Sequence, residues 1–316
     1  STIEQFVSSF DKLKQYEFDL KLINEKRPHI LDADTEKLLT EAQDALSTPS
    51  NVYGMFSNAD LEFEDAIDKD GEAHPLTQGT FIKYLESDDR KLRESAFRNV
   101  YKAYGSHNNT LGATLAGEVK KNVFNARTHH YNSARERALS NNHIPEAVYD
   151  NLVKTVHKYL PLLHRYTKLR KELLGIEDLK MYDLYTPLVK DVKFDMPYEE
   201  AKSWMLKALE PMGEEYLNVV KEGLDNRWVD VYENKGKRSG GYSSGAHLTN
   251  PFILLNWSDT VSDLYTLVHE FGHSAHSYFS RQNQPSNLSD YTIFVAEVAS
   301  TCNEALLSDY MDKHLD

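Results

Sequence analysis

Two histidines and a glutamate stand close together in the segment "LVHEFGHSAH", residues 267–276. Residues four apart share one face of an α-helix, so His269 and His273 can direct their imidazole rings at one point. Two imidazole nitrogens in this arrangement are typical ligands of Zn²⁺, and Glu270 is placed to take a proton from a water molecule. The spacing predicts one zinc ion per chain, held by His269 and His273, with Glu270 as the general base.

A zinc site of this type takes a third protein ligand from outside the histidine pair. His276 lies about 10 Å along the helix axis from His269, which is too far for both rings to bind one ion. His276 is therefore a candidate for a residue that contacts the metal ligands without binding the metal itself. In "FVAEVAST", residues 294–301, Glu297 interrupts an apolar run. An ionised carboxylate there is costly to bury unless it is paired or bound to metal, which favours Glu297 as the third ligand.

Two other interpretations of this segment stay open. Asp290 is the reserve candidate for the third ligand. Alternatively, Glu297, Ser300, Thr301 and Glu304 form a solvated polar stripe without a metal, because their spacing places them on one helical face. If Glu297 does bind the metal, Glu304 could hold a ligand histidine in its orientation from two turns further along the helix.

The region before the histidines contains candidate substrate contacts. The segment "NPFILLNW", residues 250–257, is predicted as an edge strand against which an extended peptide could bind. The preceding "SGGYSSG", residues 239–245, is predicted as a loop that a peptide backbone could approach closely. Gly241, Tyr242 and His247 are the candidate substrate contacts, and a plain core strand after a surface loop is the alternative.

The composition limits the partners of the chain. Of its 316 residues, 49 are acidic and 36 are basic, which gives a formal net charge of −13. This charge repels phosphate backbones and anionic lipid, so neither nucleic acid nor a membrane surface is an expected partner. The single cysteine, Cys302, excludes an intrachain disulfide and is expected in the core. With no signal-peptide pattern and no apolar run of about 20 residues, a cytoplasmic protein is expected.

Helical periodicity dominates the rest of the chain and predicts a mostly α fold with a small β element beside the histidine helix. Residues 1–75 are expected to form an N-terminal helical region with a small hairpin, in which Leu61, Phe63 and the Asp70-Gly71 pair are strand and turn signals. Residues 76–316 are expected to form the helical region that carries the zinc site. The expected elements are helices over 34–47, 76–175, 197–224 and from 259 onward with a break at 280–290, and a strand at 252–255.

Several motifs together resemble the thimet oligopeptidase family of zinc peptidases, most closely its oligoendopeptidase F branch. The central ones are "TLVHEFGHSAHSYFS", "VYENKGKRSGGYSSGAHLTNPFILLNW" and "FVAEVAST". The resemblance continues through "PSNVYGMFSNADLEF", "IKYLES", "NTLGATLAGEVKKNVFNA", "LPLLHRYTKLRKELLG" and "MYDLYTPLV", and so covers nearly the whole chain.

The resemblance implies a multi-helix zincin-type peptidase with a deep channel, which cleaves internal bonds of short oligopeptides. It places the zinc ligands at His269, His273 and Glu297 and the general base at Glu270. Members of the family are longer on both sides of the equivalents of Ser1 and Asp316, so a chain truncated at the C-terminus is expected. The residues that stabilise the oxyanion belong to that C-terminal part in the family, and a second chain carrying it is a candidate partner.

The sequence is compatible with three functions. The first is a zinc endopeptidase in which Glu270 activates water for amide hydrolysis. A non-catalytic helical module that binds peptides without cleaving them is the alternative from another class. A zinc aminopeptidase is the other enzymatic alternative, although no group that would anchor a free amine is evident in the sequence.

Overall fold

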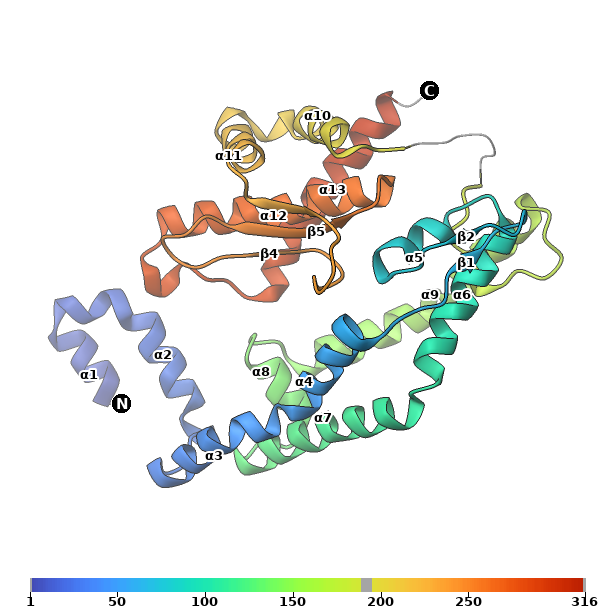
Figure 1. Cartoon of the computed structure of the whole chain (residues 1–316). Coiled ribbons are helices and arrows are strands. Elements are labelled where there is room, and N and C mark those ends of the chain that lie inside the picture. The colour runs from blue at the N-terminus through green and yellow to red at the C-terminus, as the bar shows by residue number, and fades with distance from the viewer. Residues whose placement is uncertain (1, 189–194, 315–316) are drawn as a thin grey trace. The chain divides into compact units, whose positions relative to one another are not determined.

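Helices make up most of the chain in the computed structural model, which describes residues 2–188 and 195–314 (Figure 1). The chain divides into two compact units, one comprising Ser1–Met55 and Asn109–Lys154 and the other Phe56–Asn108 and Thr155–Asp316. These limits differ from the expected boundary at residue 75 because the chain returns to the first unit after residue 108. Among the described helices, none combines the length and apolar character needed to cross a membrane.

The first unit is helical wherever it has regular structure. The expected helix over residues 34–47 is α3, where Asp32 caps the first turn by accepting a hydrogen bond from the Thr35 amide at 3.0 Å. The helices of this unit are α1 (Thr2–Ser9), α2 (Glu17–Lys26), α3 (Ala33–Leu46), α4 (Thr48–Met55), most of α7 (Asn108–Thr128), α8 (Ala134–Ser140) and the start of α9 (Glu146–Leu173).

The second unit begins with a π-helical turn (Phe56–Asp60), and the expected hairpin follows, formed by β1 (Ala66–Ile67) and β2 (Ala73–His74) as an antiparallel pair. Gly71 takes a φ of 88° in the turn, and the Asp68 carboxylate accepts the amides of Asp70 and Glu72. Leu61 and Phe63 lie before the strands, so their prediction as strand residues was wrong. Helices α5 (Gln78–Leu85) and α6 (Arg90–Gly105) follow the hairpin.

The second unit also contains α9 from Thr155 onward and two further pairs of helices. The helical stretch expected over 197–224 is divided into α10 (Tyr198–Ala208) and α11 (Glu214–Asp225), because the chain turns at Pro211 and Gly213, where Gly213 has a φ of 88°. Helices α12 (Val261–Asn283) and α13 (Ile293–His314) form the second pair, with the expected break between them.

A three-stranded sheet lies beside α12 (Figure 1). Its order is β3 (Val229–Tyr232), β5 (Phe252–Trp257) and β4 (Tyr242–Ser244), with β5 parallel to β3 and antiparallel to β4. The prediction of residues 250–257 as an edge strand was wrong, because β5 is paired on both sides. A continuous apolar run suits a central strand. The Gly/Ser-rich segment supplies the edge strand, β4, where only a loop was expected.

The main core surrounds α12 and joins it to the sheet, α10, α11 and α13. Its buried members include Trp257 of β5, Leu264 and Phe271 of α12, and Leu307 of α13. Thr260 begins α12 with a capping box, in which its hydroxyl accepts the Asp263 amide and the Asp263 carboxylate accepts the Thr260 amide. Cys302 is exposed on α13, so the expectation of a core cysteine was wrong.

A buried carboxylate ties α6 to the short 3₁₀ turn Met181–Asp183. Asp183 is fully buried and accepts hydrogen bonds from Arg90 (3.1 and 2.9 Å) and from Arg93 (2.9 Å). Burial alone would raise the pKa of Asp183, but the hydrogen bonds from Arg90 and Arg93 outweigh it and lower the pKa below its usual value. The negative charge of Asp183 therefore stabilises the guanidinium groups of both Arg90 and Arg93.

Asp183→Asn should lower the free energy of unfolding by about 3–5 kcal/mol, because it leaves the Arg93 guanidinium buried without a counter-charge. Denaturant unfolding followed by circular dichroism measures this loss. Asp178→Asn is the matched control, since Asp178 pairs with Lys180 at the surface with a side chain 73% exposed, and it should change stability by less than about 1 kcal/mol. Equal effects of the two substitutions would contradict the assigned role of Asp183.

Candidate metal and catalytic site

Helices α12 and α13 cross with their backbones in contact at Gly272. A Cβ atom placed on Gly272 would lie 2.7 Å from Cα of Ser300 and 2.9 Å from the carbonyl oxygen of Ala299. No larger residue fits at this point without moving one helix. The close approach lets side chains of α13 reach His269 and His273, which lie one turn apart on the same face of α12.

Three donor atoms converge beside this crossing. The Nε2 atoms of His269 and His273 are 3.1 Å apart, and Oε2 of Glu297 lies 3.4 Å from the first and 3.6 Å from the second. Donors bonded to zinc at about 2.0–2.1 Å in a tetrahedral site are about 3.3 Å apart. The three atoms therefore have the spacing that one zinc ion requires, and the set of two imidazoles and one carboxylate suits that metal.

Glu304, two turns after Glu297, fixes the orientation of the first histidine. Its Oε1 lies 2.5 Å from Nδ1 of His269. A carboxylate at this position holds the proton on Nδ1, which leaves the Nε2 lone pair facing the other two donors. Glu297 and Glu304 thus act on opposite sides of the same imidazole ring.

The Glu270 carboxylate lies between this donor cluster and strand β4, where it meets the backbone amide of Ser243. The residue is 5% exposed, and its Oε2 atom has no hydrogen-bond partner among the described residues. Burial raises the pKa of Glu270, the neighbouring His269 and the backbone amide of Ser243 act in the opposite direction, and Glu297 adds to the rise. A carboxylate with a raised pKa and one free oxygen is a suitable proton acceptor.

A pair of serines joins the edge strand to the histidine helix, and the sequence did not suggest it. The hydroxyl groups of Ser243 on β4 and Ser274 on α12 lie 2.8 Å apart, and Ser274 is fully buried. Because Ser274 is one turn beyond Glu270, this hydrogen bond holds the Ser243 amide next to the Glu270 carboxylate. A serine among the buried positions of an otherwise apolar helix face was the available signal.

Asn303 is a second structural residue that sequence analysis missed. It is almost fully buried, donates to the carbonyl of Val268 at 3.1 Å, and accepts from the Tyr216 hydroxyl at 2.9 Å. Val268 directly precedes His269, so these bonds connect α11 and α13 to the backbone at the first histidine. Burial is the main cause that raises the pKa of Tyr216 to about 12, which keeps its hydroxyl protonated as a donor.

The remaining predicted site residues lie outside the donor cluster. His276 stacks on Tyr291 with ring centroids 3.7 Å apart, and the Tyr291 hydroxyl approaches the His273 carbonyl at 3.3 Å. Tyr242 lies on β4 with its side chain about half exposed, and His247 is half-buried in the loop that follows. The donor cluster contains Glu297 rather than Asp290.

The predicted polar stripe on α13 is divided by the structure. Ser300 is fully buried against Gly272, whereas Thr301 is exposed. Glu297 is exposed, so the expected burial of its carboxylate was wrong, and Glu304 is partly buried, but both face His269. A uniformly solvated stripe is therefore not what α13 presents.

Two family descriptions match the sequence. Peptidase family M3 matches residues 83–315, and Oligopeptidase F matches residues 1–63. Together these two matches cover most of the chain, including α12 and α13. The resemblance drawn from the motifs is confirmed.

Individual relatives extend this likeness over the full length of the chain. Oligopeptidase PepF of Bacillus subtilis is 55% identical over 314 residues, which are 99% of this chain and 47% of that protein. Group B oligopeptidase PepB of Streptococcus agalactiae is 45% identical over 315 residues, 100% of this chain and 52% of that protein. The crystal structure of oligoendopeptidase-F from Enterococcus faecium matches with a TM-score of 0.68 at 39% identity, covering 100% of this chain and 50% of that one. The chain spans about half the length of these relatives.

Gly272→Ala should lower the free energy of unfolding by about 1–3 kcal/mol and weaken zinc binding, because the added methyl group pushes α13 and Glu297 away from α12. Denaturant midpoints and a zinc titration measure the two effects. Gly112→Ala is the matched control, since a Cβ at Gly112 of α7 meets nothing within 4 Å. That control should be neutral or stabilising by up to about 1 kcal/mol. An unchanged stability and zinc affinity in Gly272→Ala would show that the crossing tolerates a wider separation.

Proposed function

Because this chain belongs to peptidase family M3, we propose that it carries the zinc site and the general base of an endopeptidase that hydrolyses internal bonds of short oligopeptides. The observation that carries the proposal is the convergence of His269, His273 and Glu297 at zinc-like spacing, with the Glu270 carboxylate buried beside them. The names oligopeptidase PepF and oligoendopeptidase-F borne by two relatives support the same substrate class.

Each proposed ligand has a definite role. His269 and His273 bind the metal through Nε2, Glu297 binds through a carboxylate oxygen, and Glu304 orients His269 through Nδ1. Zinc bound there lowers the pKa of a water molecule and polarises the carbonyl group of the bond to be cleaved.

Glu270 moves the proton in the proposed reaction. Its Oε2 atom, which lacks a partner within the described protein, accepts a proton from the attacking water and later gives it to the departing amine. The Ser243 amide keeps the carboxylate in place during both transfers. The raised pKa helps the first transfer, because a stronger base takes the proton from the water more readily.

The free edge of β4 is the proposed binding place for the peptide backbone. An extended peptide can add to an exposed strand edge through main-chain hydrogen bonds, which do not depend on its sequence. β4 is the outer strand beside β5 and runs next to Glu270, so it takes the role that the sequence assigned to residues 250–257. Gly241 and Tyr242 are the proposed contacts on this edge.

Glu270→Gln should lower peptide cleavage by about 10²–10⁴-fold while the zinc content stays unchanged, because glutamine cannot accept the proton. Cleavage of a quenched fluorescent oligopeptide and elemental analysis of the same preparation measure the two quantities. Glu222→Gln on the exposed surface of α11 is the matched control and should leave both unchanged. Retention of most of the cleavage by Glu270→Gln would overturn the assignment of the base. Release of only N-terminal residues would favour an aminopeptidase, and binding without cleavage would favour a peptide-binding module.

Glu304→Gln should weaken zinc affinity by about 10–100-fold, because a neutral amide oxygen accepts the hydrogen bond from Nδ1 of His269 more weakly than a carboxylate does. Competition against a chromophoric chelator measures the affinity. Asp309→Asn is the matched control on the same helix, where the carboxylate pairs with Lys313 at the surface. Equal zinc affinities in Glu304→Gln and the parent would show that the His269 orientation does not depend on Glu304.

A further inference from the structure

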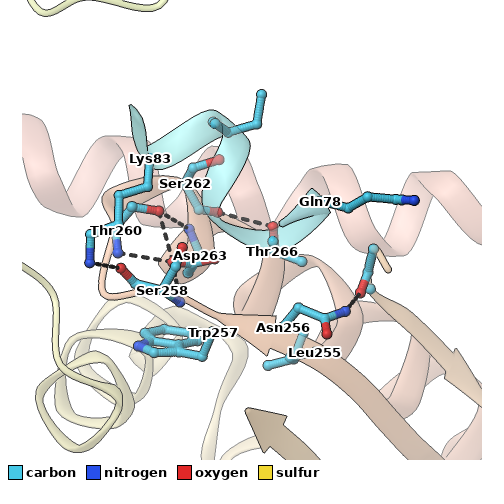
Figure 2. A pocket seen from close by; sticks show the side chains of 14 residues that line it. Gln78, Lys83, Leu255, Asn256, Trp257, Ser258, Thr260, Ser262, Asp263 and Thr266 are labelled. Atoms are coloured by element: carbon cyan, nitrogen blue, oxygen red, sulfur yellow. Dashed lines mark hydrogen bonds between the residues drawn. The ribbon is translucent and has the colours of Figure 1, made fainter. Parts of the chain in front are cut away.

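A cavity of about 170 Å³ lies between α5, the first turns of α12 and the start of β4 (Figure 2). That volume is several times what a single water molecule needs. Its walls include Ile82 and Lys83 of α5, Leu255 of β5, and Ser262 and Thr266 of α12. None of these side chains has a role in the proposed chemistry.

Gly241 joins the cavity to the catalytic carboxylate. A Cβ atom placed on Gly241 would lie 2.9 Å from Cγ2 of Thr266, 3.4 Å from Cδ2 of Leu255 and 3.5 Å from Oε1 of Glu270. Two of these three neighbours line the cavity, and the third is the proposed base. The absence of a side chain at Gly241 thus keeps the cavity and Glu270 adjacent at the edge of β4.

The charges at the cavity are already engaged by the protein. Oδ2 of Asp263 accepts four hydrogen bonds, from the amides and hydroxyl groups of Ser258 and Thr260, at 2.8–3.0 Å. The Lys83 ammonium group donates to the carbonyl of Ser258 at 2.9 Å. The two opposite charges sum to zero, and Ile82 and Leu255 supply apolar wall. A charged side chain entering this space would lose its hydration without gaining a dedicated partner, which disfavours it.

We propose that this cavity is a specificity subsite, which receives one neutral side chain of the oligopeptide next to the bond that is cleaved. The proposal rests on the proposed peptidase function, because it takes the peptide to lie along β4 beside Glu270. A peptide on that edge passes Gly241, and one of its side chains then points toward Thr266 and Leu255. Ser262, Thr266 and Ile82 are the residues that set the preference.

Ser262 offers a substitution that changes the charge of the cavity without disturbing the core. Its side chain is exposed and lies in the first turn of α12. An acidic residue is favourable in the first turn of a helix, so Ser262→Asp is expected to fold as the parent does. The carboxylate it introduces faces the cavity and has none of the partners that engage Asp263.

The test measures binding rather than turnover, in the Glu270→Gln background so that no peptide is cleaved. Fluorescence anisotropy is recorded with hexapeptides in which each position in turn carries Leu, Asp or Lys. In the background protein, one position should prefer Leu over both charged residues by about tenfold. Adding Ser262→Asp should raise the affinity of the Lys peptide at that same position by about tenfold, and adding Ser262→Lys should do the same for the Asp peptide.

Ser203→Asp is the matched control, because Ser203 is exposed on α10 and does not line the cavity. It should leave the order of the three peptides unchanged. The subsite is overturned if no position shows a preference, if the Ser262 substitutions leave the order unchanged, or if no peptide binds. The two failures are distinguishable: if the proposed function fails, no peptide binds or cleavage survives in Glu270→Gln, and if only the subsite fails, the peptides bind without the expected order.

Discussion

The contact between the backbones of α12 and α13 at Gly272 is the constraint on which the rest of the site depends. A pair of helices usually lies 8–10 Å apart, with side chains between them. Here a glycine on one helix meets the backbone of Ser300 on the other, so Glu297 can reach the two histidines. The hydrogen bond from Asn303 to the carbonyl of Val268 lies on the same interface and fixes the rotation of α13 against α12.

Helix α12 also carries the carboxylate of Glu270, which is buried away from solvent. Glu270 faces the sheet side of α12, where the Ser243–Ser274 hydrogen bond and the glycine at position 241 bring β4 close enough for a backbone amide to meet it. An ionised group with few partners is costly to bury, and a catalytic base is one of the roles for which proteins retain such a group. Metal binding and proton transfer are therefore proposed for side chains of α12, and peptide docking for strand β4 beside it.

The sequence predicted the parts of this arrangement that depend on local periodicity. The spacing of His269 and His273 follows from the helical repeat, and Glu297 stood out because it interrupts an apolar run. The strand order was not predictable in this way. The apolar residues of β5 fit an edge strand, paired on one side, as well as a central strand, paired on both. Ser274 and Asn303 were missed because a small polar residue on a buried helix face shows its partner only after the chain has folded.

The central claim is that three side chains from two helices jointly hold one zinc ion, and the most direct measurement is the zinc content per chain. Elemental analysis after equilibrium dialysis against a low zinc concentration should give about one zinc per parent chain. Glu297→Ala should retain far less, while Asp309→Ala, a surface carboxylate on the same helix, should match the parent. Equal zinc contents in the parent and Glu297→Ala, or no zinc in the parent after reconstitution, would contradict the account.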